Sequence, residues 1–167
     1  MAMHSFPNRT NRQRGFTLIE LIMIIVILGI LSAVVYVRWP VGMEEAAAVK
    51  EFKRAVRYAQ HKAMTRQYTT KAAAWGIKVN SHQYTVQRAD SSELAETEYV
   101  NRCLNNDCNT SITPAAPSVN TFVYFNGLGE PIDPTTGAPL AADTTFSITA
   151  DGGGTKVFVR QRTGYVE

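Results

Sequence analysis

Residues Arg14 to Val37 read R-G-F-T-L-I-E-L-I-M-I-I-V-I-L-G-I-L-S-A-V-V-Y-V. From Phe16 onward this segment is almost wholly apolar, and Glu20 is its only charged residue. About 22 residues in a helix extend roughly 33 Å, which is enough to cross a bilayer core of about 30 Å. The sequence therefore predicts a single membrane-spanning helix over residues 16–39.

The residues before this helix predict its orientation. Arg9, Arg12 and Arg14 precede it with no acidic residue among them, so we expect a cytoplasmic N-terminus and a translocated chain. A secretory signal has a shorter apolar region, followed by a small-residue cleavage site. Here the small residue, Gly15, comes before the apolar run, which indicates a different kind of processing.

Glu20 is an unusual residue for a helix predicted to lie in lipid. A carboxylate inside hydrocarbon is costly, and such a residue is a functional hypothesis that needs a partner. The alternative is a plain single-pass anchor with a tolerated acid near the membrane interface.

The order Gly15-Phe16-Thr17-Leu18-Ile19-Glu20 resembles the processing motif of type IV prepilins and type II secretion pseudopilins. The resemblance implies that a prepilin peptidase removes the leader, residues 1–15, by cutting after Gly15. It also implies that the enzyme methylates the new N-terminal residue, Phe16. Glu20 would then meet the N-terminal amine of Phe16 in a neighbouring subunit.

Charge and size limit the other classes of function. The chain has 167 residues and a formal net charge of +3, so loss of the three leader arginines leaves about zero. A whole-surface attraction to nucleic acid is therefore not supported. About 130 residues follow the apolar helix, enough for one modest domain.

The next segment has a helical period. Pro40 is expected to kink or end the first helix, and an amphipathic helix is predicted within residues 40–68. Its apolar stripe consists of Val49, Phe52, Val56, Ala59 and Ala63. Its basic residues lie mostly off that stripe and predict a solvated face: Lys50, Lys53, Arg54, Arg57, Lys62 and Arg66.

From residue 69 to 167 the pattern predicts a β-rich domain. A hairpin is expected over residues 75–86, with further strands at 121–125, 145–149 and 156–162. Residues 90–117 are expected to form a long loop, and residues 126–140 an ordered loop. The fold class is therefore α+β, and the resemblance implies a type IV pilin-like fold with a long N-terminal helix on an antiparallel sheet.

Cys103 and Cys108 are the two cysteines of the chain. In a translocated domain a local disulfide between them is the favoured state. The alternative is a metal site, but two cysteines without clustered histidines do not fill a zinc shell.

The soluble part resembles the minor pilins and pseudopilins of the GspH/FimT type. This resemblance is carried by a helix rich in alanine and basic residues before an aromatic strand, by F-N-G-L-G-E-P, and by a G-Y-V terminus. Major pilins commonly close a C-terminal loop with a disulfide, and no cysteine follows Cys108. The resemblance thus implies a minor subunit, held in the bacterial inner membrane with its soluble domain in the periplasm, or at the cell surface in a pilus. Its implied partners are the peptidase, other pilin or pseudopilin subunits and the inner membrane.

Two other classes of function were weighed. A FimT-like DNA-binding minor pilin would use Lys156, Arg160 and Arg162, with Lys71 and Lys78 possible neighbours. An enzyme is not predicted, because His4, His61 and His82 are isolated and no catalytic motif occurs. Three aspartates, Asp133, Asp143 and Asp151, lack the ligand spacing of a calcium loop. We therefore expect no metal, cofactor or small-molecule substrate.

Overall fold

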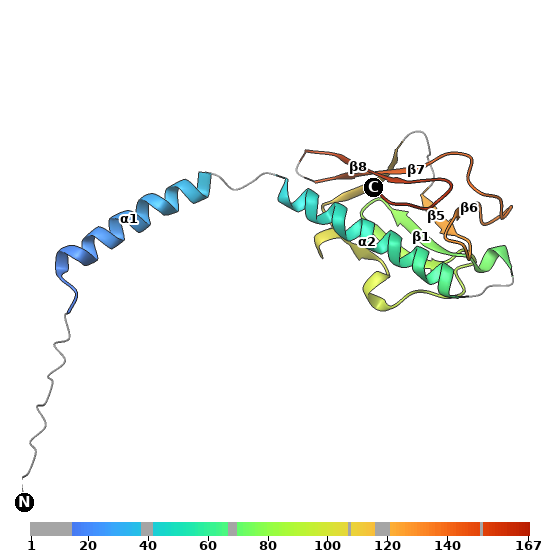
Figure 1. Cartoon of the computed structure of the whole chain (residues 1–167), viewed down its shortest axis with the longest axis horizontal. Helices are drawn as coiled ribbons and strands as arrows, with labels where there is room; N and C mark the ends of the chain where they lie inside the picture. The colour runs from blue at the N-terminus through green and yellow to red at the C-terminus, as the bar shows by residue number, and fades with distance from the viewer. Residues whose placement is uncertain (1–14, 38–41, 67–69, 107, 116–120, 151) are drawn as a thin grey trace, which may run out of the picture. The chain divides into compact units, whose positions relative to one another are not determined.

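The computed structural model describes residues 15–37, 42–66, 70–106, 108–115, 121–150 and 152–167 (Figure 1). The chain divides into two compact units, residues 1–40 and 41–167, which we describe separately. The predicted kink at Pro40 lies outside the described residues.

The first unit contains helix α1, Leu18–Val37. Its side chains are described up to Ser32, and from Leu18 to Ser32 every residue is exposed. Apolar residues therefore cover the described surface of this helix, apart from Glu20 and Ser32.

The described residues of the second unit form helix α2, Met43–Thr65, and eight strands. The strands are β1 (Trp75–Asn80), β2 (Gln83–Arg88), β3 (Arg102–Cys103), β4 (Ser111–Ala115), β5 (Phe122–Phe125), β6 (Pro131–Ile132), β7 (Thr144–Thr149) and β8 (Thr155–Val159). Three short 3-10 helices occur at Lys71–Ala73, Thr97–Tyr99 and Leu104–Asn106.

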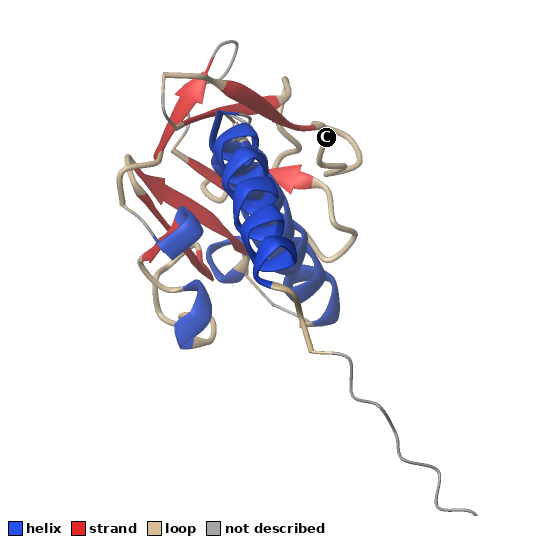
Figure 2. Ribbon diagram, turned by 90° about the vertical axis from the view of Figure 1, so that its left-hand side faces the viewer, coloured by secondary structure: helices blue, strands red, loops and turns tan. Residues whose placement is uncertain are grey.

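The strands form two antiparallel sheets, seen as separate groups of strands in Figure 2. The first sheet has the order β3-β2-β1-β5-β6, and the second has the order β4-β7-β8. In the predicted hairpin, β1 and β2 pair from Trp75 opposite Arg88 to Asn80 opposite Gln83. An N-terminal helix followed by antiparallel sheets gives an α+β layout that is consistent with a type IV pilin-like fold.

Helix α2 packs against strands of both sheets. Its predicted apolar stripe is confirmed, because all five of its members are buried. Gly42 precedes the helix with a φ of 99°, a left-handed conformation that favours glycine. The basic residues are not uniformly solvated, since Lys62 is only 8% exposed.

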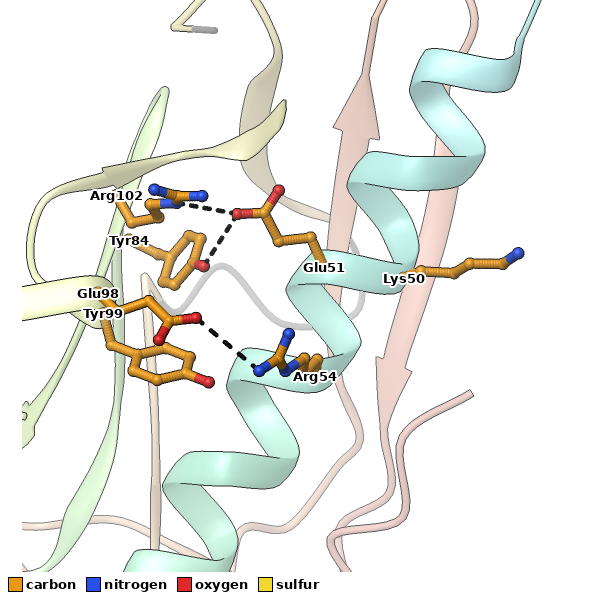
Figure 3. Close-up of a pocket in the computed structure, with 7 residues that line it drawn as sticks. All are labelled: Lys50, Glu51, Arg54, Tyr84, Glu98, Tyr99 and Arg102. Carbon is orange, nitrogen blue, oxygen red and sulfur yellow. Dashed lines mark hydrogen bonds and ion pairs between the residues drawn. The ribbon is translucent and has the colours of Figure 1, made fainter. Parts of the chain in front are cut away.

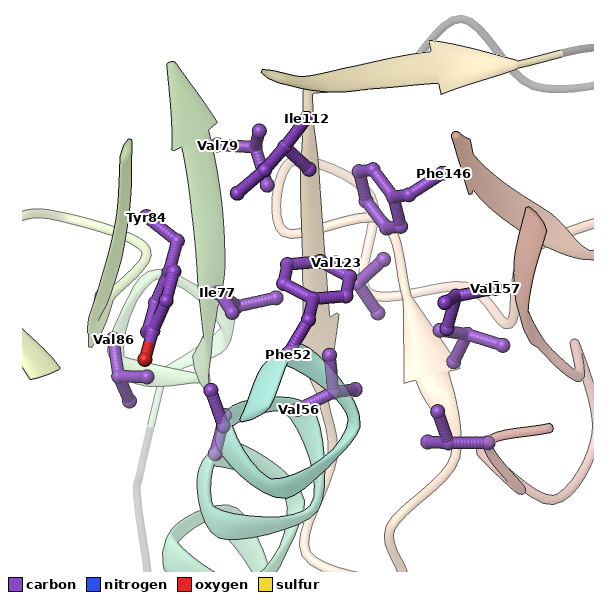
Figure 4. Packing of buried hydrophobic residues seen from close by; sticks show 14 of the residues in the cluster. Phe52, Val56, Ile77, Val79, Tyr84, Val86, Ile112, Val123, Phe146 and Val157 are labelled. Carbon is purple, nitrogen blue, oxygen red and sulfur yellow. The ribbon is translucent and has the colours of Figure 1, made fainter. Parts of the chain in front are cut away.

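The centre of the core is aromatic and joins the two sheets. Phe52 of α2 meets Tyr84 of β2 edge-on, with 6.1 Å between ring centroids. It meets Phe146 of β7 in the same way at 5.3 Å (Figure 4). Because Tyr84 and Phe146 belong to different sheets, one helix residue fills the space between them.

The prediction of a long loop over residues 90–117 is wrong near the end of that range. There Ser111–Ala115 form β4, which pairs with β7. This strand contains Pro114, which cannot donate a ladder hydrogen bond and is tolerated because β4 is an edge strand. The predicted ordered loop over residues 126–140 also contains the two-residue strand β6. The last predicted strand ends earlier than expected, at Val159.

Candidate functional sites

The predicted cleavage site lies just before α1. Thr17 caps the helix, since the backbone N–H of Glu20 donates to Thr17 Oγ1 at 3.3 Å and that of Leu21 to the Thr17 carbonyl at 3.2 Å. Gly15 and Phe16 are therefore non-helical. Phe16 is 73% exposed, and a Cβ added at Gly15 would meet no atom within 4 Å. The peptide bond between Gly15 and Phe16 therefore lies outside the helical hydrogen bonding. No described residue covers it.

Glu20 occupies the first turn of α1. A carboxylate there interacts favourably with the positive end of the helix dipole. The residue is exposed, and none of the ion pairs within the described residues includes it. The helix therefore stabilises this charge locally, but the described residues supply no counter-ion to it.

In the second unit, an acidic segment, residues 93–98, lies along α2. Glu93 pairs with Arg66, Glu96 with Lys62 at 3.2 Å, and Glu98 with Arg54 at 3.8 Å. The residue numbers of the three acids increase while those of their basic partners decrease. The segment therefore runs antiparallel to the helix. Most of these side chains are well exposed, which limits the stability that each pair contributes.

Lys62 is the exception among these bases. Its amine lies 4.5 Å from the centroid of the Trp75 ring and 3.3 Å from Tyr58 Oη. Burial lowers the pKa of Lys62, and the nearby positive charge of Arg66 lowers it further. Only a weak sequence signal marks this position: Lys62 directly precedes Ala63, at the edge of the apolar stripe.

The acidic segment continues into a polar cluster centred on Glu51 (Figure 3). Glu51 Oε1 accepts from Arg102 Nε at 3.1 Å and from Tyr84 Oη at 3.4 Å, while Oε2 accepts from the backbone N–H of Asn105 at 2.8 Å. Burial and the charge of Glu51 raise the pKa of Tyr84. The hydrogen bond that Arg102 donates to Glu51 likewise raises the pKa of Arg102.

These residues border a hollow of about 350 Å³. Its lining residues are Lys50, Glu51, Arg54, Tyr84, Glu98, Tyr99 and Arg102. In Figure 3 the amine of Lys50 points away from the other six. The carboxylate of Glu51 already accepts hydrogen bonds from Arg102 and Asn105, and the raised pKa of Tyr84 keeps its phenol protonated at neutral pH. These bonds join α2 to the chain after residue 101, and we call them the Glu51 clamp.

Cys103 and Cys108 are joined in a disulfide, with 4.9 Å between their Cα atoms. The loop that they close contains Asn105, whose backbone Glu51 binds and whose side chain donates to the Glu44 carbonyl at 2.7 Å. The disulfide loop is therefore fastened to the first half of α2.

Among the described residues, no contact joins the three side chains predicted to bind DNA. Arg160 pairs with Asp143 at 2.7 Å and with Glu167, so two carboxylates already offset its charge. Lys156 is exposed on β8, and Arg162 borders a separate hollow with Glu130. The possible neighbours are also apart: Lys71 donates to the Thr136 carbonyl, and Lys78 is exposed on β1.

The aspartates considered for calcium have other partners. Asp133 accepts from the backbone N–H groups of Thr135 at 2.7 Å and Thr136 at 3.2 Å, which lowers its pKa. The backbone N–H of Gln161 and the side chain of Arg160 lower the pKa of Asp143. Asp151 lies outside the described residues. Over the described ranges, no group of three or more histidines, cysteines, aspartates or glutamates is placed to hold a metal ion.

Comparison with known proteins places the N-terminal segment. Residues 10–36 match the family model of the prokaryotic N-terminal methylation motif. The chain thus carries a type IV prepilin-like leader, which implies processing by a prepilin peptidase and assembly with pilin subunits. Comparisons with curated proteins and with solved structures gave no match. Within the parts of the chain that are described, none of the helices has both the length and the hydropathy of a membrane span.

Proposed function

We propose that this protein is a minor pilin or minor pseudopilin. After cleavage between Gly15 and Phe16 and N-methylation of Phe16, it is built into a type IV pilus-like or type II secretion filament. Its role there is structural rather than catalytic, at the tip of the filament or in the complex that primes assembly.

The observation that carries this proposal is the methylation motif at residues 10–36 together with the surface that follows it. From Leu18 to Leu31 the large apolar side chains of α1 are between 40% and 77% exposed in the isolated chain. So large a contiguous apolar surface needs a cover of lipid or of other protein. A filament precursor has both in turn, first the membrane and then the helices of neighbouring subunits.

The proposed organisation follows from this life cycle. Residues 1–15 are the leader, and residues 16–39 are the membrane and assembly helix, supported by the 22-residue apolar run from Phe16 to Val37. Residues 40–68 form the amphipathic helix, and residues 69–167 form the β-rich domain in the periplasm. The assignment to a minor subunit rests on the GspH/FimT-like patterns and on the absence of a cysteine after Cys108.

Glu20 provides the test of assembly. We propose that it pairs with the methylated amine of Phe16 in the neighbouring subunit, since the single chain offers it no counter-ion among the described residues. Glu20→Gln should leave cleavage and membrane insertion unchanged but reduce incorporation into sheared filaments at least tenfold. Glu44→Gln, an exposed change in the other unit, is the matched control and should assemble normally. Normal incorporation of Glu20→Gln would contradict the pairing.

The alternative, a FimT-like DNA-binding subunit, has less support. Asp143 and Glu167 offset the charge of Arg160. Among the described residues, no contact joins Lys156 or Arg162 to Arg160. We therefore do not assign DNA binding to these three residues.

A further inference from the structure

Bases line the face of α2 that lies opposite its buried stripe. Lys50, Lys53, Arg57 and His61 follow one another at steps of three, four and four residues, which places them in one row along the helix. We call these four residues the basic row. Lys50, Arg57 and His61 are exposed and Lys53 is half-buried, so the row lies opposite the buried stripe.

The carboxylates of α2 lie beside this row and are used elsewhere. Glu51 is engaged by Arg102 and Asn105, and Glu45 accepts a hydrogen bond from Thr155. Glu45 lines a hollow together with Lys50 and Lys53, and Glu51 and Glu98 line another together with Lys50. The third acid, Glu44, is exposed in the first turn.

The basic row itself is uncompensated. None of the ion pairs in the described part of the chain includes Lys50, Lys53 or Arg57. Arg57 donates only to the Val166 carbonyl, at 3.3 Å. The domain after residue 41 has as many acidic as basic residues, so this row reflects separation of charge rather than a generally basic domain.

The position of the row in the chain indicates what it meets. Five residues, and so six Cα–Cα steps, separate Val37, the end of α1, from Met43, the start of α2. They span at most about 20 Å, and Lys50 lies about 10 Å further along the helix. A linker of this length allows the row to reach the surface of the membrane that would hold α1. A basic residue within about a Debye length of an anionic lipid surface is attracted to it by about 1 kcal/mol.

We propose that the basic row binds anionic phospholipid headgroups at the surface of the membrane that holds α1 before assembly. The inference rests on the membrane stage of the proposed function. Lipid binding turns the exposed face of α2 toward the bilayer. The domain, which has no net charge, is thereby held in a defined orientation before assembly.

The test uses the full chain in lipid vesicles and a water-soluble reagent that acylates lysine amines. Vesicles of phosphatidylcholine alone are compared with vesicles that contain about one third phosphatidylglycerol, and modification is measured by mass spectrometry. Lys50 and Lys53 should react about fivefold more slowly on the anionic vesicles, the factor that corresponds to about 1 kcal/mol. High salt should restore their reactivity, because it screens the attraction. Lys78 and Lys156, exposed on strands, should be unaffected.

Two variants sharpen the test. Lys53→Gln should weaken the protection of Lys50, because the row loses one of its charges. Lys78→Gln removes the same charge elsewhere and should leave the protection of Lys50 unchanged.

The other outcomes separate this inference from the proposed function. If the chain floats with the vesicles but Lys50 and Lys53 react equally on both lipids, the lipid contact is wrong and the anchor stands. If protection appears on neutral vesicles and rises with the ratio of protein to lipid, the row meets another copy of the chain, which also overturns the inference. If the chain does not float, the membrane stage fails, and both proposals fail with it.

Discussion

At the scale of single residues, Glu51 joins three distant parts of the chain to α2. Its carboxylate binds Tyr84, Arg102 and Asn105, which are 33, 51 and 54 residues away in sequence. Hydrogen bonds to charged groups stabilise more than those between neutral groups. The side chain of Glu51 is 25% exposed, so solvent screens only part of this interaction.

We expect Glu51→Gln to lower the free energy of unfolding by about 1–2 kcal/mol, because the amide keeps the shape but loses the charge that Arg102 meets. Urea unfolding of residues 42–167, which contain both core clusters, measures it. Glu44→Gln on the same helix should change the value by less than about 0.5 kcal/mol. Equal values for the two variants would contradict the clamp.

Tyr84 predicts how stability changes in alkali. Burial, and then the charge of Glu51, raise its pKa above the ordinary value of 10.0. Below pH 10 the phenol is neutral in both states, while above it the unfolded chain loses the proton more readily. Stability should therefore fall as the pH rises past about 10.

Tyr84→Phe should flatten part of this alkaline loss, as urea unfolding between pH 8 and pH 11 would measure. Burial also raises the pKa of Tyr124, so this second tyrosine should cause the loss of stability that remains in the variant. An unchanged pH dependence in Tyr84→Phe would show that the phenol does not cause the loss.

At the scale of elements, Gly76 of β1 has no room for a side chain beside β5. Gly76 pairs with Tyr124, and a Cβ at Gly76 would lie 2.1 Å from the Val123 carbonyl oxygen and 2.6 Å from Tyr124 Cα. Both of these atoms belong to the backbone, so neither can move without disturbing the sheet.

Gly76→Ala should destabilise the domain by about 3 kcal/mol or more. The matched control is Gly127→Ala, where a Cβ would meet nothing within 4 Å and the change should stay within about 0.5 kcal/mol. Thermal unfolding of the two variants compares them directly. A Gly76→Ala domain as stable as the control would mean that the strands are not so closely paired.

The elements that the sequence predicted are those with a regular period. Phe52 and Val56 lie on a helical stripe, and Ile77 and Val79 alternate along a strand, so their burial follows from local spacing. Strand β4 was missed because Pro114 interrupts its pattern, and its partner β7 is about thirty residues further on. Burial of Lys62 was missed because Trp75 and Glu96, which surround its amine, come from elsewhere in the chain.

At the scale of the whole molecule, the two units have opposite surface chemistry. The described side chains of α1 are apolar and exposed, whereas the domain after residue 41 buries its apolar residues in its own core. The methylation motif, whose match includes Gly15, Phe16 and Glu20, was predictable because it is short and has a fixed spacing. The Glu51 clamp was not predictable from local sequence, because it needs the folded domain to bring its members together.

The most direct test of the account is the intact mass and N-terminal sequence of the protein from its native membrane. We predict a chain that begins at N-methylated Phe16 and lacks residues 1–15. A chain that still carries those residues, in cells with an active prepilin peptidase, would contradict processing as a pilin and leave α1 as a plain anchor.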